Sequence, residues 1–440
     1  MRLMKWAAMS AAIAAAGLLA ACGGSGSSSS AQLRLINASA GYPSLDLTVN
    51  NTSLSTATAY GTAGSYGTVD TANSGTQVIA SGTTVLSRGA LGLVGDNKYS
   101  MIVYGWPNNM NYTMLQESEP APAAGSAKLL VLNLAPDAGS LNVYLTTGAP
   151  VTGAAPFASA VLGGGGSGYL LQTTGTYHVR VTGSASTDVN TDIRLDIPAI
   201  TLADASINTL ILTPSAGGVL VNAMTVVQQG AVASYGGTNA RVRVINSVLG
   251  ATGTTISVQA ARNGASLLDT TSASPIGLYQ IVPATNDPIT ATMTVNVNGT
   301  PTGSTALPTQ TPTLAAGADY TVLVWGTSSA PQVTLVPDDN RLPASGYAKF
   351  RLVNGDPTRV MSMSLDFSAI ASNVLAGTAS TPYPTAAITG STLSVNTTTS
   401  AVPVFSQVNF NMANQGVYTV YMLANVNSTN SLDGLLSRDR

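Results

Sequence analysis

Four segments of the 440-residue chain begin with the same seven-residue pattern, in which an Ala and an Asn stand six positions apart. These segments are Ala31–Asn37, Ala127–Asn133, Ala240–Asn246 and Ala348–Asn354. Apolar and polar residues mostly alternate between the two ends, which is typical of a β-strand with one buried face. The starts lie roughly 100 residues apart, which is the size of a domain and far longer than a solenoid repeat. We therefore predict four tandem domains.

Two further elements follow each start. The first is a triplet with a small polar residue between two apolar ones, at Leu45-Asp46-Leu47, Leu141-Asn142-Val143, Ile256-Ser257-Val258 and Leu365-Asp366-Phe367. The second is an apolar closing segment, at Tyr99–Gly105, Ile207–Leu212, Tyr320–Gly326 and Tyr418–Leu423. Short strands separated by turn residues predict an all-β chain of tandem antiparallel β-sandwiches of the immunoglobulin-like kind. A single sheet or a barrel in each unit is the alternative.

Strand alternation assigns the residues of each start to the two faces of a sheet. In the third unit, Val242 and Val244 are predicted to point into the sandwich, whereas Arg241 and Arg243 are predicted to face water.

The repeats divide the chain into six segments. We expect a signal peptide at 1–21, a lipidated Cys with a Gly/Ser tether at 22–30, and sandwiches at 31–119, 127–230, 240–337 and 348–440, the last of them divergent. Short linkers are expected at 117–126, 228–239 and 337–347.

The N-terminal segment has the features of a bacterial export signal with a lipid anchor. Arg2 and Lys5 precede an apolar stretch that is too short to span about 30 Å of hydrocarbon. The run Leu19-Ala20-Ala21-Cys22 resembles a lipobox, and this resemblance implies that the Cys22 thiol takes a diacylglycerol, that cleavage precedes it, and that the new amine is acylated. Two or more chains, palmitate among them, anchor a protein stably. An ordinary signal with an incidental Cys is the alternative.

The segment that follows the cysteine is a flexible tether. Gly23–Ser30 reads GGSGSSSS and has no side chain able to pack. Gly23, in place of Asp, resembles lipoproteins that are sent on to the outer membrane of a Gram-negative bacterium. We therefore expect a lipid-anchored cell-envelope protein.

Composition narrows the function classes. Only 8% of the residues are charged and the formal net charge is −2, so the chain has no basic stripe to neutralise phosphates and is not expected to bind nucleic acid. The 45% hydrophobic residues are enough to bury several cores. Because Cys22 is the only cysteine, stability must come from packing and not from disulfides.

Beyond the anchor, the repeated motifs resemble one known family. The shared start, a Tyr before a Gly-containing turn (Tyr66, Tyr169 and Tyr279) and a closing Tyr-Thr-Val strand are similar to the bacterial extracytoplasmic domain-of-unknown-function 4397 family, often found in tandem in lipoproteins. The similarity covers nearly all of 31–440 and is weakest at Thr378–Val404. It implies β-sandwiches at the cell surface and brings no catalytic residues.

Candidate catalytic groups are few. His178 is the only histidine and is expected on the solvent face of a strand, and no G-x-S-x-G elbow is present. Glu117 and Glu119 stand in a Pro/Ala-rich linker, where we expect them to be exposed. The acids Asp188, Asp192 and Asp196 surround Arg194 and are expected to be solvated. Asp46 and Asp366 occupy equivalent places in two units, but Asn142 and Ser257 replace them elsewhere, so a hydrogen-bonding role fits better than an acid.

Three other features allow a ligand but have simpler interpretations. Asp338-Asp339-Asn340 offers hard oxygen ligands for calcium, although a solvated turn is the favoured explanation of the triplet, and turn chemistry explains Asp137 and Asp356. Gly163–Gly168 lacks the Lys of a phosphate loop and is expected to be a turn or bulge. Trp106 and Trp325 could each stack on a sugar, but an aromatic packed at a sheet edge is simpler. No metal or cofactor is expected.

Three functions remain open. The first is a non-enzymatic binding or structural module, lipid-anchored in the envelope, with an envelope polysaccharide or a protein as its partner. The second is a carbohydrate-active hydrolase with an unrecognised carboxylate pair. The third is a calcium-stiffened adhesin rod. Fold alone does not choose among them.

Overall fold

The computed structural model describes residues 29–271, 274–400, 402–425 and 431–440. The predicted signal peptide, the lipobox residues Leu19, Ala20 and Ala21, the lipidation site Cys22 and most of the tether lie outside the described residues. Within them, no helix has the length and apolar content that crossing a membrane requires.

The first two units, numbered in chain order, each consist of two sheets. Unit 1 contains β1 (Ser30–Asn37), β2 (Ser44–Val49), β3 (Thr52–Ala59), β4 (Gly67–Asp70), β5 (Thr76–Ala80), β6 (Thr83–Arg88), β7 (Lys98–Trp106) and β8 (Asn109–Gln116). Unit 2 contains β9 (Ser126–Asn133), the short 3-10 turn η1 (Pro136–Ala138), β10 (Leu141–Thr146), β11 (Ala158–Val161), β12 (Gly165–Thr173), β13 (Gly175–Gly183), β14 (Ile193–Leu202), β15 (Ile207–Pro214), β16 (Val221–Val227) and β17 (Val232–Tyr235).

Units 3 and 4 repeat this plan. Unit 3 contains β18 (Asn239–Leu249), β19 (Thr254–Arg262), β20 (Ala265–Thr271), β21 (Gln280–Pro283), β22 (Ile289–Val297), β23 (Thr300–Ala306), β24 (Asp319–Thr327) and β25 (Ala330–Asp338). Unit 4 contains β26 (Tyr347–Asn354), β27 (Met361–Leu365), β28 (Ser368–Val374), β29 (Thr378–Ala379), β30 (Tyr383–Ala386), β31 (Ser391–Thr397), β32 (Phe405–Phe410), β33 (Val417–Ala424) and β34 (Leu432–Arg438).

Each unit is a sandwich of one sheet built around its first strand and one built around its second. The strand orders are β4-β1-β7-β8 with β3-β2-β5-β6, β12-β9-β15-β16-β17 with β11-β10-β13-β14, β21-β18-β24-β25 with β20-β19-β22-β23, and β29-β26-β33-β34 with β28-β27-β31-β32, where β30 also pairs with β26. The all-β tandem architecture is confirmed. The linker predicted before unit 3 is not free of structure, because β17 lies in it and adds a fifth strand to the first-strand sheet of unit 2.

The prediction of purely antiparallel sheets is wrong at one strand pair in every unit. The first strand pairs in parallel with the closing strand, as β1 with β7, β9 with β15, β18 with β24 and β26 with β33. Parallel neighbours need a long crossover connection. Here the chain makes that crossover by passing through the second sheet before it returns to the first.

The Asn that ends each start fixes the point where the chain leaves the first sheet. The Asn37 amide donates to the carbonyls of Tyr42 and Thr58 at 3.2 and 3.1 Å, and its oxygen accepts the Ser39 N–H at 3.1 Å. Asn133 and Asn354 make the same three kinds of contact, and Asn246 makes two of them. One side chain therefore satisfies several backbone groups at a buried corner, which explains why the residue recurs.

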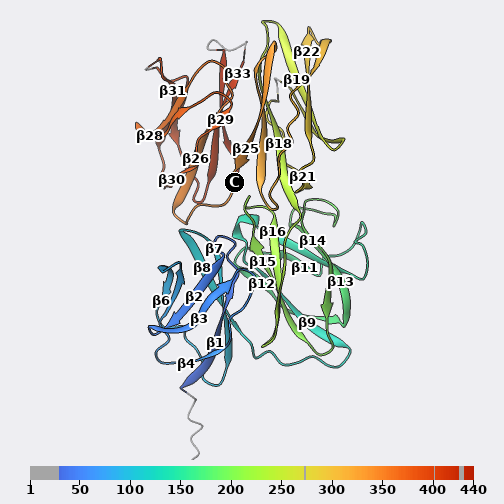
Figure 1. Ribbon diagram of the computed structural model, residues 1–440, viewed down its shortest axis with the longest axis vertical. Coiled ribbons are helices and arrows are strands. Elements are labelled where there is room, and N and C mark those ends of the chain that lie inside the picture. Colours follow the sequence, from blue (N-terminus) through green and yellow to red (C-terminus); the bar gives the residue numbers. More distant parts are fainter. Residues whose placement is uncertain (1–28, 272–273, 401, 426–430) are drawn as a thin grey trace, which may run out of the picture.

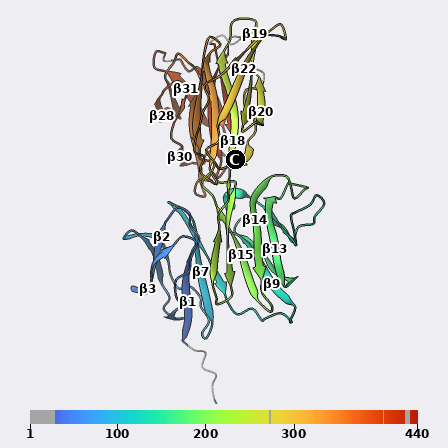
Figure 2. The same ribbon diagram turned by 45° about the vertical axis from the view of Figure 1, so that its right-hand side comes forward.

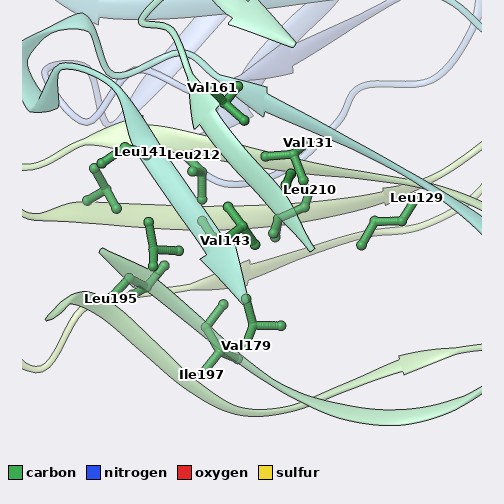
Figure 3. Close-up of a cluster of buried hydrophobic side chains, with 14 of the residues drawn as sticks. Leu129, Val131, Leu141, Val143, Val161, Val179, Leu195, Ile197, Leu210 and Leu212 are labelled. Atoms are coloured by element: carbon green, nitrogen blue, oxygen red, sulfur yellow. The ribbon is translucent and has the colours of Figure 1, made fainter. Parts of the chain in front are cut away.

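Alternating apolar side chains fill each sandwich. Figure 3 shows unit 2, where Leu129 and Val131 of β9 and Leu210 and Leu212 of β15 face Val143, Val179 and Ile197 of the other sheet. The Ala of each start, at 31, 127, 240 and 348, is buried in the core of its own unit.

The outer faces of the first-strand sheets are also buried, because the units pack against each other in twos (Figure 1). Unit 1 meets unit 2 through an apolar cluster that includes Ile36, Ile102, Leu130 and Ile211. Unit 3 meets unit 4 through a second cluster, with Ile245, Leu323, Val353, Tyr421 and Leu423. Strands buried on both faces have nearly continuous apolar sequences, and the closing segments have such sequences.

The two pairs stack end to end (Figure 2). The Ser215 hydroxyl of unit 2 donates to the Gly317 carbonyl of unit 3 at 3.0 Å, and the Asp137 carboxylate of η1 accepts the Leu342 N–H at 2.8 Å. The described chain ends at the junction of the pairs (Figure 1), where Arg440 donates to the Asp137 carbonyl. The four sandwiches thus form a two-by-two block and not a string.

Candidate functional site

A buried group of three side chains recurs at the interfaces between paired units. In unit 1, the Arg34 Nε on the outer face of β1 donates to the Ser100 hydroxyl of the parallel neighbour β7 at 2.7 Å. The Ser100 hydroxyl in turn donates to Glu117, which follows β8 directly. The Arg34 Nη2 also binds both oxygens of Glu117, at 3.0 and 3.1 Å. The arginine, the hydroxyl and the carboxylate thus come from three adjacent strands.

Units 3 and 4 carry the same arrangement. The Arg243 Nε donates to the Thr321 hydroxyl at 3.0 Å, which donates to the Asp338 Oδ2 at 2.6 Å. In unit 4, the Arg351 Nε donates to the Thr419 hydroxyl at 2.9 Å, which donates to the Asp439 Oδ2 at 2.6 Å.

The arginines of units 3 and 4 also cross the interface. The Arg243 Nη1 binds the Asp439 Oδ1 of unit 4 at 3.2 Å, and the Arg351 Nη1 binds the Asp338 Oδ1 of unit 3 at 2.6 Å. All four side chains are at most 6% exposed. Each unit therefore supplies the counter-ion for its partner, and neither charge pair is complete without both units.

Tyrosine rings cover the arginines. The Arg34 guanidinium lies 4.7 Å from the ring centroid of Tyr66, and the Arg243 guanidinium lies 4.5 Å from that of Tyr279. Arg243 also donates to the Tyr421 hydroxyl. Stacking of this kind stabilises a cation away from water, which accounts for Tyr66 and Tyr279. The third repeated tyrosine, Tyr169, lies within β12 and pairs with Leu130 of β9.

Unit 2 carries an uncharged version of the group. Leu130, Thr209 and Gln228 stand where the other units have the arginine, the hydroxyl and the carboxylate. The Gln228 amide exchanges hydrogen bonds with the Glu119 backbone at 2.9 and 3.0 Å, and the Arg34 Nη1 of unit 1 reaches the Gly230 carbonyl at 2.7 Å. The interface of units 1 and 2 thus contains one buried charge pair.

Two buried acids of unit 3, Asp338 and Asp319, have pKa values that shift in opposite directions. Burial alone would raise the pKa of Asp338, but the charges of Arg351 and Arg243 outweigh it, and the pKa of Asp338 is lowered. Burial raises the pKa of Asp319 in spite of the hydrogen bond and charge of Arg241, and the nearby charge of Asp338 raises it further. The balance between burial and the neighbouring charges therefore decides the direction for each acid.

Three predictions of exposure are wrong at these interfaces. Arg243 was assigned to the solvent face, but that face is covered by unit 4. Glu117 and Asp338 were assigned to exposed linkers, but Glu117 is buried against Arg34, and Asp338 ends β25 beneath Arg351. Alternation gives the face of a strand but not what packs on that face. The arginines at 34 and 351 were missed for the same reason, although each stands between two apolar residues of its strand.

The calcium candidates are held by protein donors. The Asp338 Oδ1 accepts from Arg351, and its Oδ2 accepts from Thr321 at 2.6 Å and from Tyr279 at 2.5 Å. Asp339 pairs with Arg341 and Lys349. The Asn340 amide donates to the Asp319 Oδ2 at 2.7 Å. Among the described residues, no three acids, histidines or cysteines gather as a metal site would require.

The polar residue in the second strand caps a β-bulge. The Asp46 Oδ1 accepts the N–H of Ala57, whose φ is +50°, and the Asn142 Oδ1 accepts the N–H of Ala160, which has the same φ. In unit 4 the equivalent contact is from the Asn373 N–H to the Ser362 hydroxyl. The predicted hydrogen-bonding role is confirmed, but Asp366 is not the counterpart of Asp46. It lies in the turn after β27 and accepts the Thr392 N–H at 2.7 Å.

The remaining acids and the histidine form small clusters on sheet surfaces or in turns. His178 contacts Asp196, which also pairs with Arg180 at 3.1 Å. His178 and Arg180 lie on the same face of β13, as predicted, and Tyr177 and Val179 are buried on the other face. Further contacts are Asp192 with Arg194 at 2.8 Å, Glu119 with Lys128, Asp188 with the Asn190 N–H and Asp356 with the Thr358 N–H.

The glycine run and the tryptophans also have structural positions. A turn at Gly163 and Gly164 leads into β12, which is bulged between Gly166 and Tyr169, as predicted. The Trp325 indole N–H donates to Thr334 at 2.9 Å at the edge of the cluster between units 3 and 4. The Trp106 indole N–H donates to Asp137 of unit 2 at 3.2 Å.

The sequence matches one family, described as Domain of unknown function (DUF4397), over residues 31–144 and 240–361. These two stretches make up more than half of the 440 residues. The chain belongs to this family. The two matches lie in the first and third units and run on into the next unit, so the DUF4397 domain occurs here in tandem copies. No curated protein matches the sequence significantly.

Solved structures match the fold only remotely. A candidate cell adhesion protein from Bacteroides eggerthii shares 12% identity over 50% of this chain and 97% of its own, with a TM-score of 0.24. The fimbrial anchor protein Mfa2 from Porphyromonas gingivalis shares 11% identity over 72% and 100%, with a TM-score of 0.16. The TIE protein of Bacillus anthracis shares 10% identity over 90% and 68%, with a TM-score of 0.15.

Proposed function

We propose that this DUF4397 protein is a cell-envelope lipoprotein whose four units act as one non-enzymatic binding or structural body. The observation that carries the proposal is the use of the buried charges. The chain has few charged residues, and the buried arginines and acids of units 3 and 4 neutralise one another across the interface between these units. Groups committed in this way hold domains in position and are not available for proton transfer to a substrate.

The paired packing supports a rigid body in preference to a flexible string of beads. Apolar clusters join unit 1 to unit 2 and unit 3 to unit 4, and hydrogen bonds join the two pairs. A large body held near a membrane by a short, flexible Gly/Ser tether presents surfaces whose positions relative to one another are fixed. That geometry suits an outer-membrane protein that binds an envelope polysaccharide or another protein.

The lipid anchor is tested on the full chain expressed in a Gram-negative host. The parent protein is expected in the membrane fraction and in the detergent phase of a phase-separation assay, with an N-terminal peptide that starts at Cys22 and carries palmitate by mass spectrometry. Cys22→Ala should move the protein to the aqueous phase, whereas Ser25→Ala in the same tether should leave it in the detergent phase. Detergent partitioning of the Cys22→Ala chain would contradict the anchor.

The single-body proposal is tested by limited proteolysis of the full chain. We expect native protein to resist cleavage between units 1 and 2 and between units 3 and 4, because residues 117–119 and 338–341 of the connecting segments are tied into the interfaces. Rapid release of four separate fragments of domain size would refute a single body.

A further inference from the structure

Stacking the two pairs creates a cleft that neither pair has alone. Its volume is about 600 Å³, which lies within the range of about 300–1,000 Å³ typical of small-ligand sites. One wall is the turn between β7 and β8 of unit 1, and the other is the linker into unit 4 with the starts of β26 and β30. The residues that matter here are Trp106, Asn108, Asn109, Asp339, Arg341, Tyr347 and Lys349. Domain junctions of this kind are preferred places for ligand sites.

The wall formed by the linker carries an excess of positive charge. The Arg341 Nε and Nη2 bind the two oxygens of Asp339 at 2.7 and 2.8 Å, and the Lys349 Nζ lies 3.0 Å from the same carboxylate. Two cations thus share one acid. The hydrogen bond from Arg341 and the charge of Lys349 outweigh the effect of burial and lower the pKa of Asp339 to about 2. The Arg341 side chain remains 34% exposed, so its guanidinium is accessible from the cleft.

The opposite wall holds Arg341 in place. The guanidinium lies 4.7 Å from the centroid of the Trp106 ring. The Trp106 indole N–H is bound in turn by the buried Asp137 of unit 2. The cation is therefore positioned by residues of two other units before any ligand arrives, which lowers the entropic cost of binding.

An aromatic ring and free amides complete the cleft. The Tyr347 side chain is 47% exposed, although large apolar side chains usually pack. The side-chain amides of Asn108 and Asn109 make no hydrogen bond to another described residue. An exposed ring suits the C–H face of a sugar, and free amides suit its hydroxyl groups. Apolar residues supply the rest of the lining, namely Pro107, Leu342, Pro343, Ala344, Pro382 and Pro384.

We propose that this cleft binds an acidic saccharide, with the sugar ring stacked on Tyr347 and its carboxylate paired with Arg341. The inference rests on the proposed non-enzymatic binding function and names the site and the ligand class for it. A guanidinium forms directed, charge-assisted hydrogen bonds with a carboxylate. The partly exposed guanidinium of Arg341 selects an acidic sugar over a neutral one.

The test is calorimetric titration of the full chain in detergent with a trimer of galacturonic acid. We expect saturable binding at sub-millimolar to millimolar concentrations. Tyr347→Ala should weaken it at least tenfold, and so should methyl esterification of the trimer, which removes its charge. Tyr383→Ala is the matched control, because Tyr383 is 44% exposed, lies on the neighbouring β30 and does not line the cleft. Its affinity should stay within twofold of the parent.

Four results would each overturn the proposal. They are no saturable heat at millimolar trimer, unchanged affinity in Tyr347→Ala, equal affinity for the methyl ester, and equal affinity for an acidic peptide such as hexaglutamate. The Cys22→Ala chain is expected to bind the trimer as tightly as the parent. Detergent partitioning therefore reports on the anchor and calorimetry reports on the saccharide site, so the two proposals can fail independently.

Discussion

Replacing Asp338 with Ala is expected to destabilise units 3 and 4 together. The Asp338 side chain has no exposed surface and accepts from Arg351, Thr321 and Tyr279 at 2.5 to 2.6 Å. Its loss removes the acid that pairs with Arg351, while Arg243 keeps its pair with Asp439. Breaking a buried ion pair from one side typically costs about 3–5 kcal/mol, because a charge stays buried without its partner.

The loss can be measured by urea unfolding followed through Trp325, which packs between the same two units. A Trp106→Phe background makes Trp325 the only tryptophan once the chain is cleaved before Cys22. At a slope of about 2 kcal/mol/M, the expected loss lowers the urea midpoint by about 2 M. Adding Arg351→Met to Asp338→Ala should recover part of the loss, because the charge then leaves with its counter-ion.

A matched surface pair provides the control. Asp192 contacts Arg194 at 2.8 Å but is 39% exposed, so Asp192→Ala should cost no more than about 1 kcal/mol. If Asp338→Ala costs as little as Asp192→Ala, the buried network does not hold the two units together and the reasoning is refuted.

Further tests address the other parts of the block. Arg34→Leu should cost about 3 kcal/mol in urea unfolding, but Arg34→Leu with Glu117→Gln should cost clearly less, because unit 2 uses this Leu and Gln naturally; equal costs would contradict this account. Asp339 has a folded-state pKa of about 2 against about 3.9 when unfolded, so its contribution is complete above pH of about 4 and is lost as the pH falls toward 2. Asp339→Asn should make the urea midpoint depend less on pH between about 4 and 2. Above that window, the dependence of the midpoint on pH should be the same as in the parent. Gly317→Ala should lower the urea midpoint, since its φ is +75° and a Cβ would lie 2.6 Å from the Ser215 Cβ; an unchanged midpoint would refute that contact. Calcium or a chelator should leave the melting temperature unchanged, and a calcium-dependent rise would revive the adhesin rod.

The repeated starts, the closing strands and the sandwich class are readable from sequence because each depends on local alternation and on turn residues. The Asn of each start is equally visible in the sequence, because its side chain forms hydrogen bonds with backbone groups of the same unit. The parallel pairing of first and closing strands is not visible, because the partners are more than 60 residues apart in unit 1.

The site was less predictable than the fold. Arg243 and Glu117 were misplaced because their burial depends on a neighbouring unit. One signal was available: the closing segments are apolar at successive positions, which indicates strands covered on both faces. In unit 4 the triplet at 365–367 imitates the pattern of the second strand by chance. The true counterpart, Ser362, lacks the charge that drew notice to Asp46.

The pairing of units also constrains how such a chain folds as it is made and how its number of domains changes. A chain that emerges from its N-terminus delivers unit 1 first, with Ile36, Ile102 and Leu115 on an uncovered sheet. Until roughly a hundred more residues have followed, that surface invites aggregation and calls for a chaperone. The smallest piece of this architecture that can be duplicated or deleted without exposing an apolar sheet is therefore two domains, so the lineage of such a chain should gain and lose them in even numbers.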